Sequence, residues 1–226
     1  MSISDNIKHY QSLMPRGTRL IAVSKTKPVE DLMQAYQAGQ RLFGENKALE
    51  MRDKYLVMPK DIQWHFIGHL QTNKVKYIAP FVSMIHSVDS LHLLKEINKE
   101  GVKNGRCIDC LLQIDIAHEQ TKFGMEDAVA EELLTGDAYR EMNNIRICGL
   151  MGIGSITDDR EQTRKEFAHL KELFDKFKRL YFSQEDCFSE LSMGMSEDYE
   201  TALQQCSTLV RIGSSIFGAR DYGTSH

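Results

Sequence analysis

The sequence predicts an α/β fold in which about eight β-strands alternate with helices and close into a single (β/α)8 barrel, or TIM barrel. Short apolar and β-branched runs alternate with longer segments of helical period, which is typical of βα units and a parallel sheet. The length of 226 residues suits one such barrel. No repeat, low-complexity stretch or Pro/Gly/Ser-rich linker divides the chain, so we expect one domain over residues 1–226. An open doubly wound sheet is the alternative.

The first half of the chain contains four predicted strands, each followed by a helical segment. The run LIAVSK, residues 20–25, is the first strand, and Pro28 opens a helix that Gly39 ends. The apolar residues of that helix share one face: Val29, Leu32, Met33 and Tyr36. The next strands are RLFGEN (41–46), IQWHFIGHL (62–70) and SMIHSV (83–88). Asp89 or Ser90 is suited to cap the helix after the fourth strand.

The second half repeats this alternation. The run IDCLLQIDI, residues 108–116, is apolar almost throughout, as expected of a strand covered on both faces. The last three strands are predicted at IRICGLMGI (145–153), FSELSMGM (188–195) and LVRIGSSIFG (209–218). Helices are predicted at residues 125–134, from Thr157 or Asp158 to Tyr181, and from Ser196 to about Cys206.

Composition and charge exclude several classes of protein. The hydrophobic share of 42% and charged share of 27% indicate a globular chain. A net charge of -4 lacks the basic field that nucleic-acid binders use, so we expect no nucleic-acid partner. The N-terminus lacks a basic-then-apolar signal, and no apolar run approaches the roughly 18 residues of a membrane span. We therefore expect a cytoplasmic protein without a membrane partner.

Cysteine and histidine spacings predict no metal site. The five cysteines are odd in number and irregularly spaced, which favours reduced thiols. Cys107 and Cys110 form a CxxC, but on a strand their side chains point to opposite faces. His65 and His69 form an HxxxH that has no obvious third ligand.

The residues at the carboxyl ends of most predicted strands form a mostly polar set, and the loops of a parallel barrel meet there at one mouth. These candidates are Lys25, Asn46, His65, Ser87, Met151, Ser192 and Arg211. Asp115 and Lys122, which flank a loop, are placed to reach the same mouth. Ordinary charged loop residues are the alternative for these two.

Lys25 directly follows an apolar strand. Burial beside a second cation, Lys27, would disfavour the charged form of its amine and free it to attack an aldehyde. The alternative is a lysine that extends into solvent at a strand end, as most lysines do.

Two glycine-serine turns follow the last two strands, SMGMS (192–196) and RIGSS (211–215). Barrels often bind phosphate there through backbone N–H groups, hydroxyls and a helix N-terminus. A lysine and a phosphate cup together suit pyridoxal 5′-phosphate (PLP) or the sugar phosphate of an aldolase. Arg211 favours PLP, because an arginine facing the pyridine nitrogen keeps that nitrogen unprotonated and the ring a poor electron sink.

Six motifs in order along the chain resemble the YggS/PROSC family of PLP homeostasis proteins. They are AVSKTKP (22–28), FGEN (43–46), WHFIGHLQTNK (64–74), GLMGI (149–153), SMGMSEDYETAL (192–203) and VRIGSSIFGAR (210–220). The resemblance implies a fold-type III barrel similar to the N-terminal domain of alanine racemase, with PLP held as a Schiff base on Lys25.

The same resemblance implies roles for the other candidate residues. Ser192, Gly213 and Ser214 would contact the phosphate, and Arg211 would face the pyridine nitrogen. Asn46 and His65 would line the ring, while Met193 and Ile212 would add backbone or apolar contacts.

The family's function implies a carrier or buffer in intracellular PLP homeostasis and vitamin B6 balance. We expect a monomer that binds PLP reversibly and passes it to PLP-dependent enzymes. Alanine racemase also has a second domain that supplies a catalytic tyrosine, and this chain ends soon after the last predicted strand. We therefore expect no turnover. A PLP-dependent, racemase-like enzyme and a Schiff-base aldolase are the alternatives.

Overall fold

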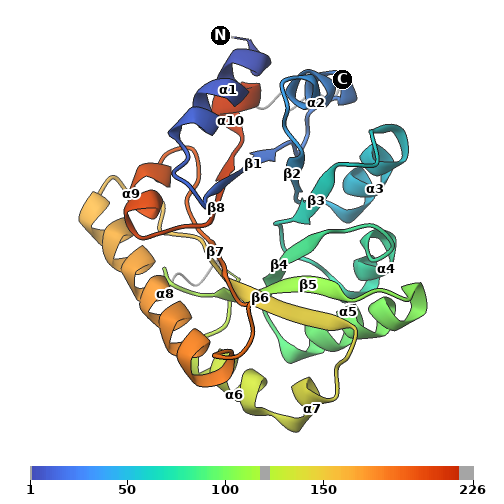
Figure 1. Cartoon of the computed structure of the whole chain (residues 1–226), viewed down its shortest axis with the longest axis vertical. Coiled ribbons are helices and arrows are strands. Elements are labelled where there is room, and N and C mark those ends of the chain that lie inside the picture. The colour runs from blue at the N-terminus through green and yellow to red at the C-terminus, as the bar shows by residue number, and fades with distance from the viewer. Residues whose placement is uncertain (1, 118–122, 219–226) are drawn as a thin grey trace, which may run out of the picture.

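Within residues 2–117 and 123–218, which the computed structural model describes, eight parallel strands form a closed barrel (Figure 1). The strands are β1 (Arg19–Val23), β2 (Leu42–Glu45), β3 (Gln63–Phe66), β4 (Met84–Val88), β5 (Ile108–Ile114), β6 (Ile145–Gly152), β7 (Glu190–Ser192) and β8 (Leu209–Ile212). Each strand pairs with the next, and β8 pairs with β1 from Arg19 opposite Leu209 to Ala22 opposite Ile212. The predicted closed barrel is confirmed, and the open-sheet alternative is excluded.

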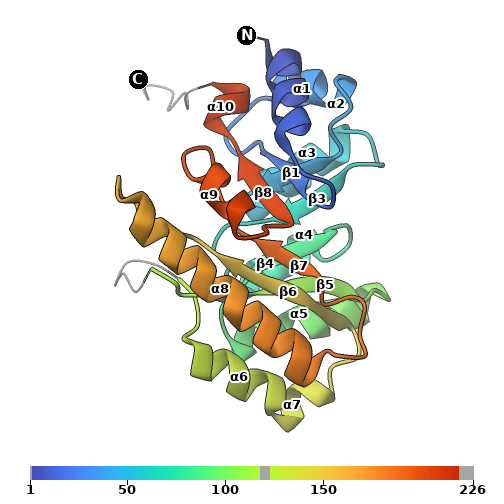
Figure 2. The same ribbon diagram turned by 60° about the vertical axis from the view of Figure 1, so that its left-hand side comes forward.

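Helices cover the outside of the barrel (Figure 1). They are α1 (Ile3–Leu13), α2 (Val29–Gln37), α3 (Ala48–Val57), the 3₁₀ turn η1 (Thr72–Lys74), α4 (Val75–Ile78), α5 (Leu91–Asn104), α6 (Asp127–Thr135), α7 (Asp137–Arg140), α8 (Arg160–Tyr181), α9 (Tyr199–Gln204) and α10 (Ser214–Phe217). The view in Figure 2 shows α8 lying across the outside of β6 and α1 standing near α10. Asn6 of α1 donates to the carbonyl of Ile216 of α10 at 3.0 Å. None of the helices described is long and apolar enough to cross a membrane.

Local capping explains several helix starts. The Ser90 hydroxyl accepts from the N–H of Leu93, which confirms Ser90 as the cap of α5. The cap of α8 is Asp159, one or two residues after the predicted start, because its carboxylate accepts from the N–H groups of Glu161 and Gln162. The helix α1 lies outside the predicted elements, and it begins with a capping box between Ser2 and Asp5.

All eight strands are shorter than predicted, and the last differs most: β8 ends at Ile212, and Ser214–Phe217 of the predicted strand form the helix α10 instead. β1 ends at Val23, two residues before Lys25, because the chain turns there. β3 ends at Phe66, and Gly68 then packs so closely on the backbone of Asn46 that an added Cβ would lie 2.7 Å from it. β7 comprises only Glu190–Ser192.

The strand alternation produces two cores, because successive side chains point to opposite faces of the sheet. The larger core lies between barrel and helices and includes Ala22, Phe43, Trp64 and Leu191. A smaller apolar cluster fills the barrel interior: Ile21, Met84, Leu111, Cys148, Met151 and Leu209. The alternation also points four polar residues of β3, β4, β7 and β8 inward: His65, His86, Ser192 and Arg211. One side of the barrel interior is therefore polar.

Candidate cofactor site at the carboxyl ends of the strands

Lys25 lies in a tight turn that follows β1. The turn is closed by the Lys27 N–H, which donates to the Ser24 carbonyl at 3.1 Å. Thr26 has a φ of 64°, an uncommon left-handed conformation for a β-branched residue. Lys25 is half-buried in this turn. Because β1 ends at Val23, strand alternation does not set the directions in which Lys25 and Lys27 point.

The side chain of Lys27 reaches across to the last strand-helix unit. Its Nζ donates to the carbonyl of Phe217 at the end of α10, at 3.0 Å. Pro28, the cap of α2, follows immediately. Lys27 therefore contributes a contact between the β1 turn and α10.

The two predicted glycine-serine turns meet beside the end of β1. The Ser196 hydroxyl oxygen lies 3.4 Å from the backbone nitrogen of Gly213 and 3.5 Å from the Ser214 hydroxyl oxygen. Gly213 also faces β1, since a Cβ added there would lie 3.3 Å from the Cβ of Val23. Hydroxyl groups and a backbone N–H thus converge near the Lys25 turn, a donor set suited to an anionic oxygen. Ser196 is not among the predicted site residues, although it lies within the SMGMS turn.

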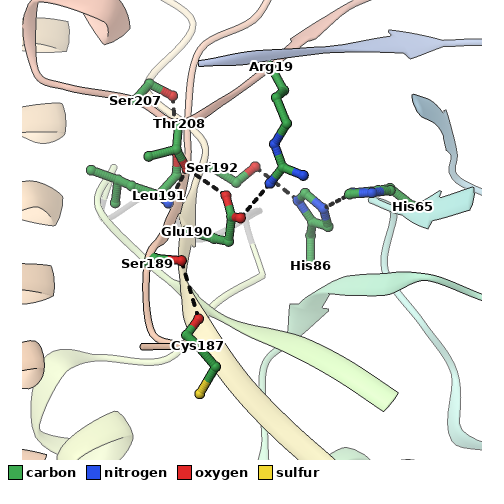
Figure 3. Close-up of polar contacts among 10 residues, drawn as sticks. All are labelled: Arg19, His65, His86, Cys187, Ser189, Glu190, Leu191, Ser192, Ser207 and Thr208. Carbon is green, nitrogen blue, oxygen red and sulfur yellow. Dashed lines mark hydrogen bonds and ion pairs between the residues drawn. The ribbon is translucent and has the colours of Figure 1, made fainter. Parts of the chain in front are cut away.

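A hydrogen-bonded chain of four buried polar residues crosses the barrel interior. Arg211 Nη1 donates to the Ser192 Oγ at 2.6 Å, and the same oxygen lies 2.9 Å from His86 Nδ1. His86 Nε2 lies 2.8 Å from His65 Nδ1. Figure 3 shows the two rings facing each other, with His86 between Ser192 and His65. Arg211 Nη2 donates to the Gly152 carbonyl at 3.0 Å. The interior of the barrel thereby orients the Arg211 guanidinium.

Burial determines the charge of this chain. It lowers the pKa of His65 to about 3 and the pKa of His86 well below its usual value, with cationic neighbours acting in the same direction. Burial also lowers the pKa of Arg211 to about 10, which leaves the guanidinium charged at neutral pH. Both imidazoles are therefore neutral beside a cationic arginine.

The Ser192 hydroxyl accepts from Arg211, and the neutral rings leave two directions of donation beyond it. In one, Ser192 donates to His86 Nδ1 and the Nε2–H of His86 donates to His65 Nδ1. In the other, the Nδ1–H of His65 donates to His86 Nε2 and the Nδ1–H of His86 donates to Ser192 Oγ. His86 is not among the predicted site residues, because nothing in SMIHSV indicates a partner 106 residues away.

Asn46 follows β2 and is half-buried. Its Oδ1 is buried and has no hydrogen-bond partner within the described part of the chain. The residue borders a cavity of about 360 Å³ between the ends of β2 and β3, which is lined by Asn46, Lys47, Ala48, Leu49, Glu50, Phe66, His69, Leu70, Gln71 and Lys74. A polar atom without a partner beside a cavity is an available contact for a ligand.

The remaining predicted residues lie in different surroundings. Met193 and Ile212 have fully buried side chains in the core between barrel and helices, so only their backbone faces the site. The two histidines of the HxxxH separate: His65 points into the barrel, whereas His69 pairs with Asp89 and stacks on Phe123. Lys122 lies outside the described residues.

Asp115, the other predicted loop residue, lies just after β5. Its N–H donates to the Met125 carbonyl at 2.9 Å, and Gly124 approaches so closely that an added Cβ would lie 2.6 Å from the Asp115 nitrogen. These contacts hold the ends of the loop together.

Comparisons with known proteins show the family of this chain. The family model described as "Alanine racemase, N-terminal domain" matches residues 1–221. A protein of Aquifex aeolicus named "Pyridoxal phosphate homeostasis protein" is 40% identical over 205 residues, which cover 90% of this chain and 88% of that protein.

Solved structures show the same barrel. PipY of Synechococcus elongatus, with PLP bound, has a TM-score of 0.86 at 31% identity, and without PLP it has a TM-score of 0.90 at 30% identity. Both comparisons cover 96% of this chain and 100% of PipY. Alanine racemase of Bartonella henselae has a TM-score of 0.71 at 15% identity, over 99% of this chain and 62% of the racemase. The likeness to the racemase concerns the fold alone.

Proposed function

The chain belongs to the pyridoxal phosphate homeostasis proteins, within the family of alanine racemase N-terminal domains, and from this premise we propose that it binds PLP at the barrel mouth. The observation that supports this best is the convergence of the Lys25 turn with the Gly213–Ser196 contact. When bound, PLP supplies an aldehyde that a lysine amine can hold covalently with loss of water.

The residues present fit the chemical groups of PLP. Ser196, Ser214 and the N–H of Gly213 are placed to hold a phosphate. Asn46 offers a buried oxygen that has no partner within the described residues. Lys25 is the covalent attachment point in this assignment. The resemblance implies a phosphate contact for Ser192, but its hydroxyl bonds to Arg211 and His86 in the barrel interior, so we assign it to orienting Arg211. The side chains of Met193 and Ile212 are buried in the core, which leaves their backbone to shape the two turns.

Arg211 supports a carrier rather than a catalyst. A guanidinium can only donate hydrogen bonds, and the Ser192 and Gly152 contacts hold it in place. Facing a pyridine nitrogen, it keeps that nitrogen unprotonated, which weakens carbanion stabilisation. We therefore assign the protein a role in PLP homeostasis, with reversible binding and without turnover. Delivery to PLP-dependent enzymes, a monomeric state and a cytoplasmic location complete the proposal.

Borohydride reduction of the PLP-loaded protein, followed by peptide mass mapping, tests the attachment point. We expect the reduced PLP label on Lys25, and loss of both the label and the PLP absorbance band in Lys25→Ala. Lys27→Ala is the matched control, because Lys27 lies two residues away and bonds to Phe217. A label on Lys27, or an unchanged band in Lys25→Ala, would contradict the assignment.

The racemase-like alternative is tested separately. The PLP-loaded protein is incubated with individual amino acids in heavy water, and loss of the Cα proton signal is followed by NMR. Exchange no faster than with free PLP supports the carrier. Faster exchange that is lost in Lys25→Ala would instead establish an enzyme.

A further inference from the structure

A buried ionic cluster lies next to the Lys25 turn, outside the barrel interior. It consists of Glu45 at the end of β2 and of Glu50 and Lys54 on α3. The side chain of Glu45 is fully buried, that of Lys54 is 7% exposed and that of Glu50 is 22% exposed. Buried charges are costly to desolvate, and well-packed apolar residues in place of a buried ion pair often give equal or greater stability. A role other than stability is therefore worth seeking in the contacts of this cluster.

Lys54 uses all three donors of its ammonium group. Its Nζ lies 2.8 Å from Glu45 Oε1, 2.7 Å from Glu50 Oε1 and 2.7 Å from the carbonyl of Ser24. Burial raises the pKa of Glu45, whereas Lys54 opposes this change. The lysine is thus both the counter-charge of the cluster and its link to the backbone after β1.

Both neighbours of Lys25 are bound by this cluster. The Ser24 hydroxyl donates to Glu45 Oε1 at 2.6 Å, and the Ser24 carbonyl accepts from Lys54. On the other side, the Thr26 N–H donates to Glu50 Oε1 at 2.6 Å. The residue before Lys25 and the residue after it are therefore each held by a charged group of the next strand-helix unit.

The turn needs such support because of its backbone. Thr26 adopts a φ of 64°, which a β-branched residue reaches only at an energetic cost. The bond from its N–H to Glu50 is made in that conformation. Strained backbone at a functional site persists where the surrounding contacts determine it, and it pre-organises the side chain beside it.

We propose that Lys54, held between Glu45 and Glu50, is a positioning residue that fixes the Ser24–Thr26 turn and so places the Lys25 amine for PLP. This inference rests on the proposed function of Lys25. It assigns to Glu45 of the FGEN motif and to Lys54 of α3 a role in ligand binding that acts through the backbone of the Ser24–Thr26 turn.

Substitutions at Glu50 test the proposal most cleanly, because this partly exposed residue is easier to replace than the buried Lys54. Glu50→Ala removes the acceptor for Thr26, whereas Glu50→Gln retains an oxygen that can accept the same hydrogen bond. We expect Glu50→Ala to weaken PLP binding about tenfold or more and Glu50→Gln to restore most of the loss. The dissociation constant for PLP is measured by absorbance titration. Urea unfolding of each variant verifies that the titrated protein is folded.

A second readout follows the PLP-free protein. Lys25 is labelled with an amine-reactive reagent, and the labelling rate is measured by peptide mass mapping. We expect Glu50→Ala to raise the Lys25 rate about threefold or more, because the turn is no longer held, and Glu50→Gln to stay near the original rate. Lys54→Met should act like Glu50→Ala in both measurements if it folds.

Glu131→Ala is the matched control. Glu131 also bonds to a lysine, Lys176, at 2.7 Å, and its side chain is 32% exposed, but it joins α6 to α8. We expect unchanged PLP affinity and an unchanged Lys25 labelling rate in this variant.

The outcomes separate the two proposals. If the unsubstituted protein binds PLP on Lys25 while folded Glu50→Ala matches it in affinity and labelling rate, the positioning role is wrong and the proposed function stands. If the unsubstituted protein carries no PLP on Lys25, the proposed function itself fails. Equal losses of PLP affinity in Glu131→Ala and Glu50→Ala would also overturn the positioning role, because the loss would then come from general destabilisation of the protein.

Discussion

Acid is expected to destabilise the fold through the buried histidines of the barrel interior. The pKa of His65 is about 3 in the folded protein, against 6.5 for an ordinary histidine. Below pH 6.5 the unfolded chain binds a proton that the folded chain does not, so stability falls as the pH falls from 6.5 towards 3. The sign follows from a folded-state pKa that lies below the unfolded-state value.

The magnitude follows from this difference. At about pH 5, protonation of His65 in the unfolded state raises the equilibrium constant for unfolding roughly thirtyfold. This lowers the free energy of unfolding by about 2 kcal/mol. His86 acts in the same direction, because its pKa is also lowered by burial. Neither effect requires a change in the surface charges.

Urea unfolding of the PLP-free protein at about pH 7.5 and about pH 5 measures the effect, with the single tryptophan, Trp64, as a fluorescent probe. Between about pH 7.5 and about pH 5, we expect the free energy of unfolding of His65→Gln to fall by about 2 kcal/mol less than that of the unsubstituted protein. His92→Gln, at an exposed position of α5, is the control and should lose as much as the unsubstituted protein. An unchanged pH dependence in His65→Gln would refute the argument that this ring is neutral because it is buried.

Three further substitutions probe the barrel and the mouth. Gly149→Ala should lower the free energy of unfolding, measured in urea, by about 3 kcal/mol or more. The reason is that Gly149 has a φ of 153° and that an added Cβ would lie 1.7 Å from the Glu190 carbonyl oxygen. A loss of stability below about 1 kcal/mol would contradict that geometry. Ser192→Ala should cost about 1 to 3 kcal/mol in the same assay, because buried Arg211 and His86 lose a partner, and an unchanged urea midpoint would show that the chain relaxes freely. Ser196→Ala should weaken PLP binding about tenfold while changing the free energy of unfolding by less than about 0.5 kcal/mol. If an absorbance titration shows unchanged PLP affinity, the Ser196 hydroxyl does not bind the phosphate.

Much of the fold follows from local patterns along the sequence. The order of strands and helices is visible in the alternation of apolar runs with helical periods, and the count of about eight strands predicts closure. The Ser90 cap is local as well, because the hydroxyl bonds to the N–H of Leu93 three residues later. Lys25 and the two glycine-serine turns are identifiable because they follow strands whose ends must meet.

Only the tertiary structure decides which side chains meet and where strands stop. The contact of Ser196 with Gly213 and the contact of His86 with Ser192 join residues far apart in the sequence, and no local pattern specifies them. The turn after β1 is likewise bound by a distant residue, because the ammonium of Lys54, 30 residues after Ser24, donates to the Ser24 carbonyl. Backbone periodicity is a local property of the chain, whereas hydrogen-bond partners and burial depend on closure of the barrel, which brings all eight strand ends together.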